Sequence, residues 1–435
     1  MKNSGYRILA HGQFRSNDTW ETGLNNNDAI VGPSGCGKTR GYAKPNILQM
    51  NGSMVVTDTK GALYHELGPT LKRHGYRVME INLADPMASD WGYNPLLHVR
   101  YDKRRECYDE QDILTLSTAL VPIENSDEPF WDLAAKMMLE GMVAYTLEFL
   151  PYLEHNLCTV GTLLAEMPSG RYDRLLQETC EIAPDGFTAM RYKMTQICHK
   201  ADKMYSSIQG VLAEKISPFS FDGAKSLFHN PRQISFRTLA EEKTAIFLTI
   251  SDTDPTNYRL ANLFYTQALH LLCHIADHSP GHRLAMPVHF YLDDFASNVC
   301  IPDFDRIISV IRSREISVSI IFQSLSQLES LYGHARALTI LNNCDNMLYL
   351  GGQDTETAKF IGQKANKPTS AILQMPLDSA WLFTRGAVPQ QVKKYRLENH
   401  PRYQELPECP TAHRTDEMPE QDHGEDVAAE PGSAA

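Results

Sequence analysis

One segment of the chain has the residue types and spacing of a phosphate-binding loop, G-x-x-x-x-G-K-T. Its glycines allow successive backbone N–H groups to turn toward an anion, in conformations that a side chain disfavours. Lys38 would then reach the β- and γ-phosphates of ATP, and the Thr39 hydroxyl would ligate Mg²⁺. The predicted nucleotide-binding residues are Gly32, Pro33, Ser34, Gly35, Cys36, Gly37, Lys38, Thr39 and Arg40.

An acidic pair, Asp293 and Asp294, follows the apolar run 288–292. At the end of a buried strand, such a pair indicates the second half of an ATPase site. Asp293 would hold the water shell of Mg²⁺, and Asp294 would orient the attacking water. The same pattern is also common where an acidic residue caps a helix. The phosphate-binding loop upstream favours the catalytic interpretation.

Three further features have two interpretations each. Gln323, which ends the apolar run 317–322, is either a sensor that bonds the γ-phosphate or the attacking water, or a helix-capping or loop amide. Cys36 is either a small filler of the loop or an oxidation-sensitive thiol. The cluster of Lys393, Lys394 and Arg396 is either a solvated face or a phosphate contact.

The elements that must position these residues form a β-α-β-α-β rhythm. The run 29–31 before the loop predicts a buried strand, and a helix from Lys38 toward Met50 should kink or restart at Pro45. Short connections between such elements indicate a doubly wound, mostly parallel sheet of the α/β class. Further strands are predicted at 53–58, 76–82, 244–250, 288–292, 317–322 and 346–350, helices at 62–74, 258–276, from 304 to near 312 and at 354–362, and a closing hairpin at 380–384 and 391–396.

Between residues 103 and 239 strand-like runs are replaced by helical patterns. This change predicts an all-α domain inserted into the α/β domain. Its helices are expected at 112–121, 130–150, 159–166, 184–198 and 205–216. The predicted organisation is an N-terminal arm (1–25), an α/β domain (26–102 and 240–400), the insertion (103–239) and a disordered acidic tail (404–435).

Composition limits the class of protein. The chain has 435 residues and a net charge of −12, but much of that charge lies after Gln404, so the body could still bind phosphates through local basic patches. The nine cysteines are scattered and never spaced as C-x-x-C, which favours a reducing cytoplasm and argues against zinc. We find no secretory signal and no membrane span in the sequence.

Several short motifs in order resemble one known family, the type IV coupling proteins of conjugative secretion systems (TraG/TraD-like DNA-transfer ATPases), in a short form without N-terminal membrane helices. The resemblance covers about residues 25–400. The motifs are the loop 32–39, Lys44-Pro45-Asn46, Val56-Thr57-Asp58-Thr59-Lys60-Gly61, Tyr93-Asn94-Pro95-Leu96, Phe130-Trp131, Leu292-Asp293-Asp294-Phe295-Ala296, 322–328 and Leu350-Gly351-Gly352.

This resemblance implies a RecA-like P-loop ATPase core with an inserted all-α domain, assembled as a homo-hexamer. Such a ring uses ATP and Mg²⁺ to pass relaxase-bound single-stranded DNA to type IV secretion channel proteins. It also implies that Arg312 reaches the nucleotide of a neighbouring subunit, with Arg314 as the alternative. Without a membrane helix, the protein is expected in the cytoplasm, recruited to the inner face of the membrane through partners.

Two residues depart from the family pattern. The family usually has Glu in place of Asp294, so the shorter carboxylate predicts slow turnover, and it usually has Pro in place of Thr59, which affects a turn. Two other hypotheses therefore stay open. One is an adaptor that binds nucleotide without hydrolysis and recruits relaxase or other cargo. The other is a different RecA-like motor, for DNA packaging or chromosome partition.

Overall fold

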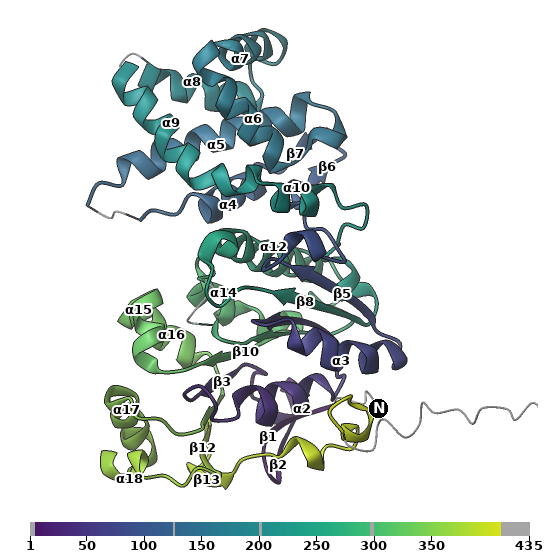
Figure 1. Ribbon diagram of the computed structural model, residues 1–435, viewed down its shortest axis with the longest axis vertical. Helices are drawn as coiled ribbons and strands as arrows, with labels where there is room; N and C mark the ends of the chain where they lie inside the picture. The colour runs from purple at the N-terminus through teal and green to yellow at the C-terminus, as the bar shows by residue number, and fades with distance from the viewer. Residues whose placement is uncertain (1–4, 125–126, 200–201, 296–299, 410–435) are drawn as a thin grey trace, which may run out of the picture.

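The computed structural model describes residues 5–124, 127–199, 202–295 and 300–409, which form an α/β body with a helical part at one end (Figure 1). Ala296 and residues 410–435, which include most of the predicted acidic tail, lie outside the described residues. The tail prediction is wrong for residues 404–409. Leu406 and Cys409 are buried there, and the Thr70 hydroxyl donates to the Glu405 carbonyl, so this stretch is part of the body.

A nine-stranded sheet in the order β13-β12-β11-β3-β10-β9-β4-β8-β5 forms the centre of the body. All pairs from β11 to β5 are parallel, and β12 and β13 add an antiparallel hairpin at one edge, which confirms the predicted α/β class and closing hairpin. The strands are β3 (Asp28–Val31), β4 (Ser53–Asp58), β5 (Arg77–Asn82), β8 (Thr244–Thr249), β9 (Val288–Leu292), β10 (Ile316–Phe322), β11 (Asn346–Tyr349), β12 (Ser379–Thr384) and β13 (Gln390–Lys393).

Helices cover both faces of this sheet, because its central parallel strands are apolar on both sides. On one face, α2 (Lys44–Ile47) and α3 (Ala62–Arg73) pack on the side chains of Val56 and Phe247. The other face is covered by α12 (Tyr258–Asp277), α14 (Phe304–Val310), α16 (His334–Asn342) and α17 (Thr355–Ala365). The result is three layers, in which the ends of the strands remain free to carry a site.

The chain leaves the sheet after β5 and returns at β8, and the helices between them form the upper part of Figure 1. Two of these helices, α7 and α10, were not predicted. The sequence of α7 is mostly polar and buries only Tyr172, Leu176 and Thr179, so few apolar residues mark it. The helices are α4 (Glu110–Leu120), α5 (Phe130–Phe149), α6 (Leu157–Glu166), α7 (Arg171–Ile182), α8 (Phe187–His199), α9 (Asp202–Ile216) and α10 (Asp222–His229).

The expectation that residues 103–239 contain no strand is wrong in one detail. A two-residue ladder of β6 (Tyr101–Asp102) and β7 (Cys107–Tyr108) stands at the entrance to the helical part. Among the residues that the structure covers, no helix is both long and apolar enough to cross a bilayer.

The N-terminal segment, expected to be an arm (1–25), contains a folded hairpin. It consists of β1 (Tyr6–Ala10) and β2 (Gln13–Ser16), followed by the short helix α1 (Thr19–Thr22). The side-chain amide of Asn46 bonds both the N–H and the carbonyl of Ile8, each at 2.8 Å, which attaches the hairpin to α2. The polar pattern concealed this strand because Arg7 points inward to a buried partner, Asp28, at 2.8 Å.

Candidate nucleotide site

The phosphate-binding loop lies between β3 and the helix that follows, as predicted. Gly35 and Gly37 have φ of 76° and 97°, which only glycine adopts without strain. From Thr39 to Ala43 the chain forms a π-helical turn (η1), and α2 follows, with Pro45 in its first turn. The predicted restart at Pro45 is thus a change from π- to α-helix.

Lys38 lies inside this loop. Its Nζ donates to the carbonyls of Gly32 at 2.8 Å and Pro33 at 3.0 Å, and the residue is 7% exposed. An ammonium group has three N–H donors, so one donor remains for an anion in the loop. A buried cation held by neutral carbonyls suits a phosphate ligand.

The two halves of the predicted ATPase site meet at the carboxyl edge of the sheet. The Thr39 hydroxyl donates to Oδ2 of Asp293 at 2.7 Å, although 254 positions separate them in the sequence. The contact arises because β3, β10 and β9 are parallel neighbours, so the loop after β3 and the turn after β9 lie at the same edge.

Asp293 has the surroundings of a metal ligand. It is 9% exposed, and its other oxygen accepts the backbone N–H of Asp294 at 3.1 Å. Burial raises the pKa of Asp293 to about 6, against the opposing effect of the Thr39 hydrogen bond. In the described part of the chain, no basic side chain forms an ion pair with it. A hydroxyl beside a buried, unpaired carboxylate fits Mg²⁺, which prefers oxygen ligands.

Asp294 is half-buried and has a φ of 50°, in the left-handed region that non-glycine residues seldom adopt. The backbone therefore sets the direction of its Cα–Cβ bond. A helical residue, Phe295, follows directly, but 296–299 lie outside the described range, so the capping alternative stays untested.

Gln323 lies directly beside the loop, because the N–H of Gly32 donates to the carbonyl of Phe322 at 3.1 Å. Its side chain is exposed. Ser324, and not Gln323, caps the next helix, α15 (Leu325–Tyr332), by accepting the N–H of Gln327. Gln323 therefore does not cap this helix; it lies in the loop after β10, so the loop-amide interpretation and the sensor role both stay open.

Sequence reasoning missed Tyr349, the last residue of β11. Its hydroxyl is buried and, within the described residues, has no hydrogen-bond partner. It lies beside the loop: a Cβ built on Gly352 would stand 3.6 Å from this hydroxyl and 3.5 Å from Cδ of Pro33. Burial raises the pKa of Tyr349 to about 12. An unpaired buried hydroxyl is costly, so this one also fits a site that receives a polar ligand. A tyrosine that ends a strand gives no sequence signal of this kind.

The basic residues near the C-terminus have different surroundings, so no one interpretation, solvated face or phosphate contact, applies to all three. Lys394 donates from Nζ to the carbonyl of Cys36 at 3.0 Å and so reaches the loop. Lys393 and Arg396 are exposed. Cys36 is half-buried, and burial raises the pKa of its thiol, which favours the filler interpretation over a reactive thiolate.

Arg40, the residue after the loop, contacts the same C-terminal segment. Its guanidinium pairs with Glu398 at 2.7 Å and with Glu408 at 2.5 Å. The segment 394–409, which we call the strap, therefore covers the start of the helix that follows the loop.

Arg312 does not join this site. It lies before β10, at the amino edge of the sheet, and donates to the carbonyl of Thr19 at 3.2 Å. The seven residues of β10 separate it from the loop by about 20 Å, at roughly 3.3 Å per residue. The alternative, Arg314, is paired with Asp277 at 2.8 Å.

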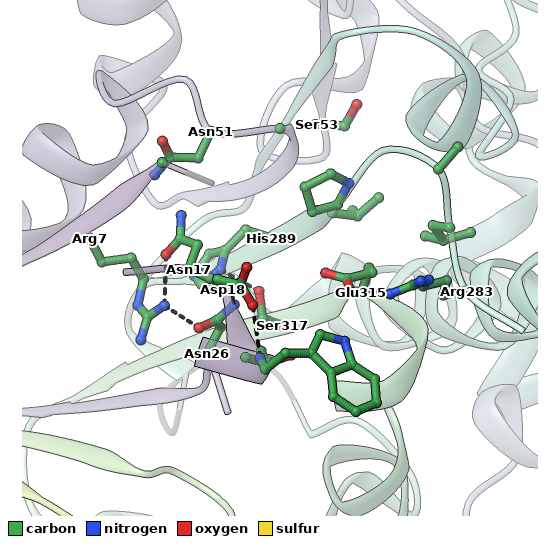
Figure 2. A pocket seen from close by; sticks show the side chains of 18 of the residues that line it. Arg7, Asn17, Asp18, Asn26, Asn51, Ser53, Arg283, His289, Glu315 and Ser317 are labelled. Carbon is green, nitrogen blue, oxygen red and sulfur yellow. Dashed lines mark hydrogen bonds and ion pairs between the residues drawn. The ribbon is translucent and has the colours of Figure 1, made fainter. Parts of the chain in front are cut away.

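A cavity of about 340 Å³, separate from the nucleotide site, lies at that amino edge (Figure 2). In Figure 2, Arg7 points toward Asn17 and Asn26, and their side-chain oxygens accept its hydrogen bonds at 2.8 and 2.5 Å. His289 bonds the hydroxyls of Ser317 and Ser319, each at 2.7 Å. These polar groups are paired within the protein, so the cavity gives no sign of a ligand.

Comparison with known proteins gives consistent matches. The family model described as type IV secretory system conjugative DNA transfer matches residues 5–395. Protein VirD4 of Rhizobium radiobacter is 23% identical over 365 residues, which cover 81% of this chain and 50% of that protein. Conjugal transfer protein TraG of Escherichia coli is 23% identical over 359 residues, which cover 78% of this chain and 54% of that protein. The chain thus spans about half the length of these relatives.

Solved structures show the same fold. The unbound conjugative coupling protein TrwBdeltaN70 superposes with a TM-score of 0.66 at 15% identity, over 91% of this chain and 88% of that chain. TrwB in complex with ADP and Mg²⁺ superposes with a TM-score of 0.65 at 15% identity, over 91% and 90% of the two chains.

Proposed function

Because the chain belongs to the type IV secretory system conjugative DNA transfer family, we propose that it is the ATP-driven motor of a coupling protein. It would pass relaxase-bound single-stranded DNA to a type IV secretion channel. The contact between Thr39 and Asp293 carries this proposal, since it unites a phosphate-binding loop and an acidic strand end. TrwB has been solved with the ATP analogue ADPNP and with ADP and Mg²⁺, which supports the same ligands here.

Each residue of the site has a distinct task in this proposal. Thr39 and Asp293 would hold Mg²⁺, which when bound adds positive charge next to the β- and γ-phosphates. Lys38 adds a second positive charge, and the N–H groups of the loop bind the phosphate oxygens. Asp294 would orient the attacking water, and Gln323 would bond the γ-phosphate or that water.

The motor would act as a homo-hexamer in which Arg312 serves the neighbouring subunit. Its distance from its own loop supports action in trans, because it cannot reach a nucleotide bound there. Arg312→Ala should lose hydrolysis, and mixing with Lys38→Ala subunits should restore part of it. Arg314→Ala tests the alternative residue and should keep hydrolysis, because Arg314 is paired with Asp277 in its own subunit. No rescue at any mixing ratio would contradict action in trans.

In this proposal residues 26–102 and 240–400 form the motor, and the helical insertion 103–239 and the acidic tail recruit relaxase and channel proteins. Recruitment would bring the protein from the cytoplasm to the inner face of the membrane. Co-purification with a relaxase, lost on replacement of the insertion, would support this division. Retention by the motor alone would contradict it.

Asp294 supports a second candidate, the adaptor that binds nucleotide without turnover. Its side chain is one methylene shorter than that of the usual Glu, and its backbone has a φ of 50°. Asp294→Glu should raise the turnover rate if reach is limiting. An unchanged or lower rate would remove that explanation for slow turnover.

Hydrolysis of ATP by the purified protein, with and without single-stranded DNA, is the deciding measurement, with Lys38→Ala as the blank. Stimulation by single-stranded DNA that is absent from the blank is the expected result. Nucleotide binding without hydrolysis would favour the adaptor. Stimulation only by double-stranded DNA would favour a packaging or partition motor.

A further inference from the structure

A basic turn lies at the lower edge of the helical part, where β7 follows β6 (Figure 1). It carries Lys103, Arg104 and Arg105, and no other three consecutive residues of the sequence are all Lys or Arg. All three are exposed, and in the part of the chain that the structure describes none of them forms an ion pair. Arg100, just before them, is paired with Asp112 at 2.7 Å. Three cations without such a partner, on a protein of net charge −12, indicate a surface that attracts an anion.

A row of four rings lies next to this basic turn. The rings of Tyr101 and Tyr108, which pair across the ladder, have centroids 5.0 Å apart. The Tyr108 ring is 6.0 Å from that of His155, which is 5.6 Å from that of Tyr152. Tyr101 and Tyr152, at the two ends of this ring row, are 49% and 67% exposed, whereas His155 is buried. The row therefore presents two accessible ring faces on which flat groups can stack.

The protein holds the basic turn and the ring row in place before any ligand binds. Oδ1 of Asp102 accepts the backbone N–H groups of Arg104 at 2.8 Å and of Arg105 at 3.3 Å. At the other end, the carbonyl of His155 accepts the side-chain amide of Asn94 at 2.8 Å. Contacts that are ordered in advance reduce the entropy lost on binding.

The base of this hairpin is attached to the α/β body as well as to the helical part. Nη1 of Arg100 donates to Nδ1 of His274 on α12 at 2.7 Å, and the same guanidinium pairs with Asp112 of α4. Helix α12 covers one face of the central sheet. A ligand bound at the hairpin is therefore in contact with a segment that joins the two parts of the protein.

Cations beside exposed rings suit one class of ligand, a single-stranded nucleic acid. Proteins that bind single strands place cations along the phosphates and aromatic side chains against the bases. A duplex keeps the faces of its bases stacked within the helix, so it cannot use the rings in this way. A free phosphate has no flat group to place on them.

We propose that the basic turn and the ring row form a binding site for single-stranded DNA. Bases stack on Tyr101 and Tyr152, and phosphates lie against Lys103, Arg104 and Arg105. The inference rests on the proposed function, which supplies single-stranded DNA as the cargo. Because every base has a flat face, the site tolerates different sequences.

The charge of the basic turn is tested by the salt dependence of DNA binding, measured by fluorescence anisotropy with labelled oligothymidylate. Lys103→Gln, Arg104→Gln and Arg105→Gln together should weaken binding at low salt at least about tenfold. The slope of log affinity against log salt should fall by about 2, since each phosphate contact of a single strand contributes about 0.7. An unchanged slope would overturn the inference.

A matched control makes the same change in net charge elsewhere. Arg171→Gln, Lys225→Gln and Arg237→Gln remove three exposed cations that are paired with carboxylates in the fold. This variant should keep the slope of the unmodified protein. A loss equal to that of the basic-turn variant would show that only total charge matters, which would also overturn the inference.

The rings are tested by a pair of double variants. Tyr101→Ala with Tyr152→Ala should weaken the binding of oligothymidylate at least about fivefold and leave the salt slope unchanged, because stacking is lost and no charge is removed. Tyr101→Phe with Tyr152→Phe keeps both rings and should bind like the unmodified protein. Equal affinities for the Ala and Phe variants would contradict stacking and overturn the inference.

A crosslink on the unmodified protein decides the matter if a variant does not fold. Oligothymidylate that contains 5-iodouracil should crosslink under ultraviolet light to Tyr101 or Tyr152, and an excess of the unlabelled strand should prevent this. Competed crosslinks confined to other residues would overturn the inference. So would variants that keep DNA binding but lose binding to phosphatidylglycerol vesicles or to a relaxase, since the surface would then face a membrane or a protein.

Failure of the proposed function would look different. In that case the unmodified protein would bind no single-stranded DNA at any salt concentration, and its hydrolysis of ATP would not respond to DNA. Binding of single-stranded DNA that every variant retains would overturn only the site at the hairpin.

Discussion

Two buried carboxylates on the same sheet have opposite surroundings. Asp28, at the amino end of β3, is fully buried and accepts hydrogen bonds from Arg7 at 2.8 Å, Tyr42 at 2.5 Å and Asn346 at 2.9 Å. Asp293, at the carboxyl end of β9, accepts only the Thr39 hydroxyl and an adjacent backbone N–H among the described residues. Asp28 has a buried ion-pair partner, Arg7, whereas Asp293 has none among the described residues.

We expect Asp28 to contribute mainly to the stability of the fold and Asp293 mainly to function. A buried charge that is paired and hydrogen-bonded holds its neighbours in place. Asp28 thereby joins the N-terminal hairpin, the helix after the loop and β11 to one point. Asp293 keeps acceptor capacity at the edge of the sheet that carries the phosphate-binding loop. Each prediction below changes one side of this contrast.

The largest expected effect is on the Asp28 side. Asp28→Asn leaves Arg7, which is 3% exposed, buried without its counterion. The free energy of unfolding should fall by about 3–5 kcal/mol, measured by urea titration. Adding Arg7→Met should recover most of that loss, because it removes the unpaired charge. A loss below about 1 kcal/mol for the single change would contradict the role of the pair.

Replacing Asp293 by Asn should have the opposite effect to Asp28→Asn: stability should be kept and hydrolysis lost. Asp293→Asn removes a buried charge whose pKa is raised to about 6, so without metal the free energy of unfolding should stay equal or rise, by up to about 3 kcal/mol at pH 7. If Asp293 is the Mg²⁺ ligand that we propose, hydrolysis of ATP should fall at least about a hundredfold. A protein that unfolds more easily but still hydrolyses ATP would reverse our assignment of the two carboxylates.

Lowering the pH should lower the free energy of unfolding, because His289 is buried as the neutral form at the amino edge of the sheet. Burial lowers the pKa of His289 to about 3, against an ordinary value of 6.5, so the folded protein holds it neutral. The contribution of neutral His289 to the free energy of unfolding is complete above pH 6.5. It is lost as the pH falls from 6.5 toward 3, at up to about 1.4 kcal/mol per pH unit. His289→Gln should show a flatter profile in urea unfolding between pH 7 and pH 4. Parallel profiles for the two proteins would contradict this.

The smallest effect is expected at Tyr349. Tyr349→Phe removes a buried hydroxyl that has no partner in the described chain, so stability should change by less than about 0.5 kcal/mol or improve. If the hydroxyl meets the nucleotide or the loop during turnover, the hydrolysis rate should fall several-fold. Phe290, buried on β9 away from this hydroxyl, provides a control as Phe290→Leu, which should lower stability and leave the rate constant of the folded protein unchanged.

Much of the fold could be predicted, because its strands are continuous apolar runs with turn residues between them. The boundaries of β4 and β9 agree with the predicted ranges 53–58 and 288–292. The N-terminal hairpin could not be predicted, since the inward Arg7 mimics a surface residue until Asp28 is known to face it. The helix α7 was missed for a different reason: it is mostly polar, and only Tyr172, Leu176 and Thr179 are buried.

For the site, the sequence alone determined the chemistry: glycines, Lys38 and Thr39 at fixed spacing, and an acidic pair after a strand. Local spacing is enough there, because a phosphate cradle is built from consecutive residues. Only the tertiary structure decided which distant groups meet it. The parallel order of β3, β10 and β9 brings Asp293 to Thr39, and the return of the chain after β13 brings Lys394 to Cys36. Such contacts depend on the order of the strands in the sheet and on the position of the strap. Neither can be predicted from the spacing of residues along the chain.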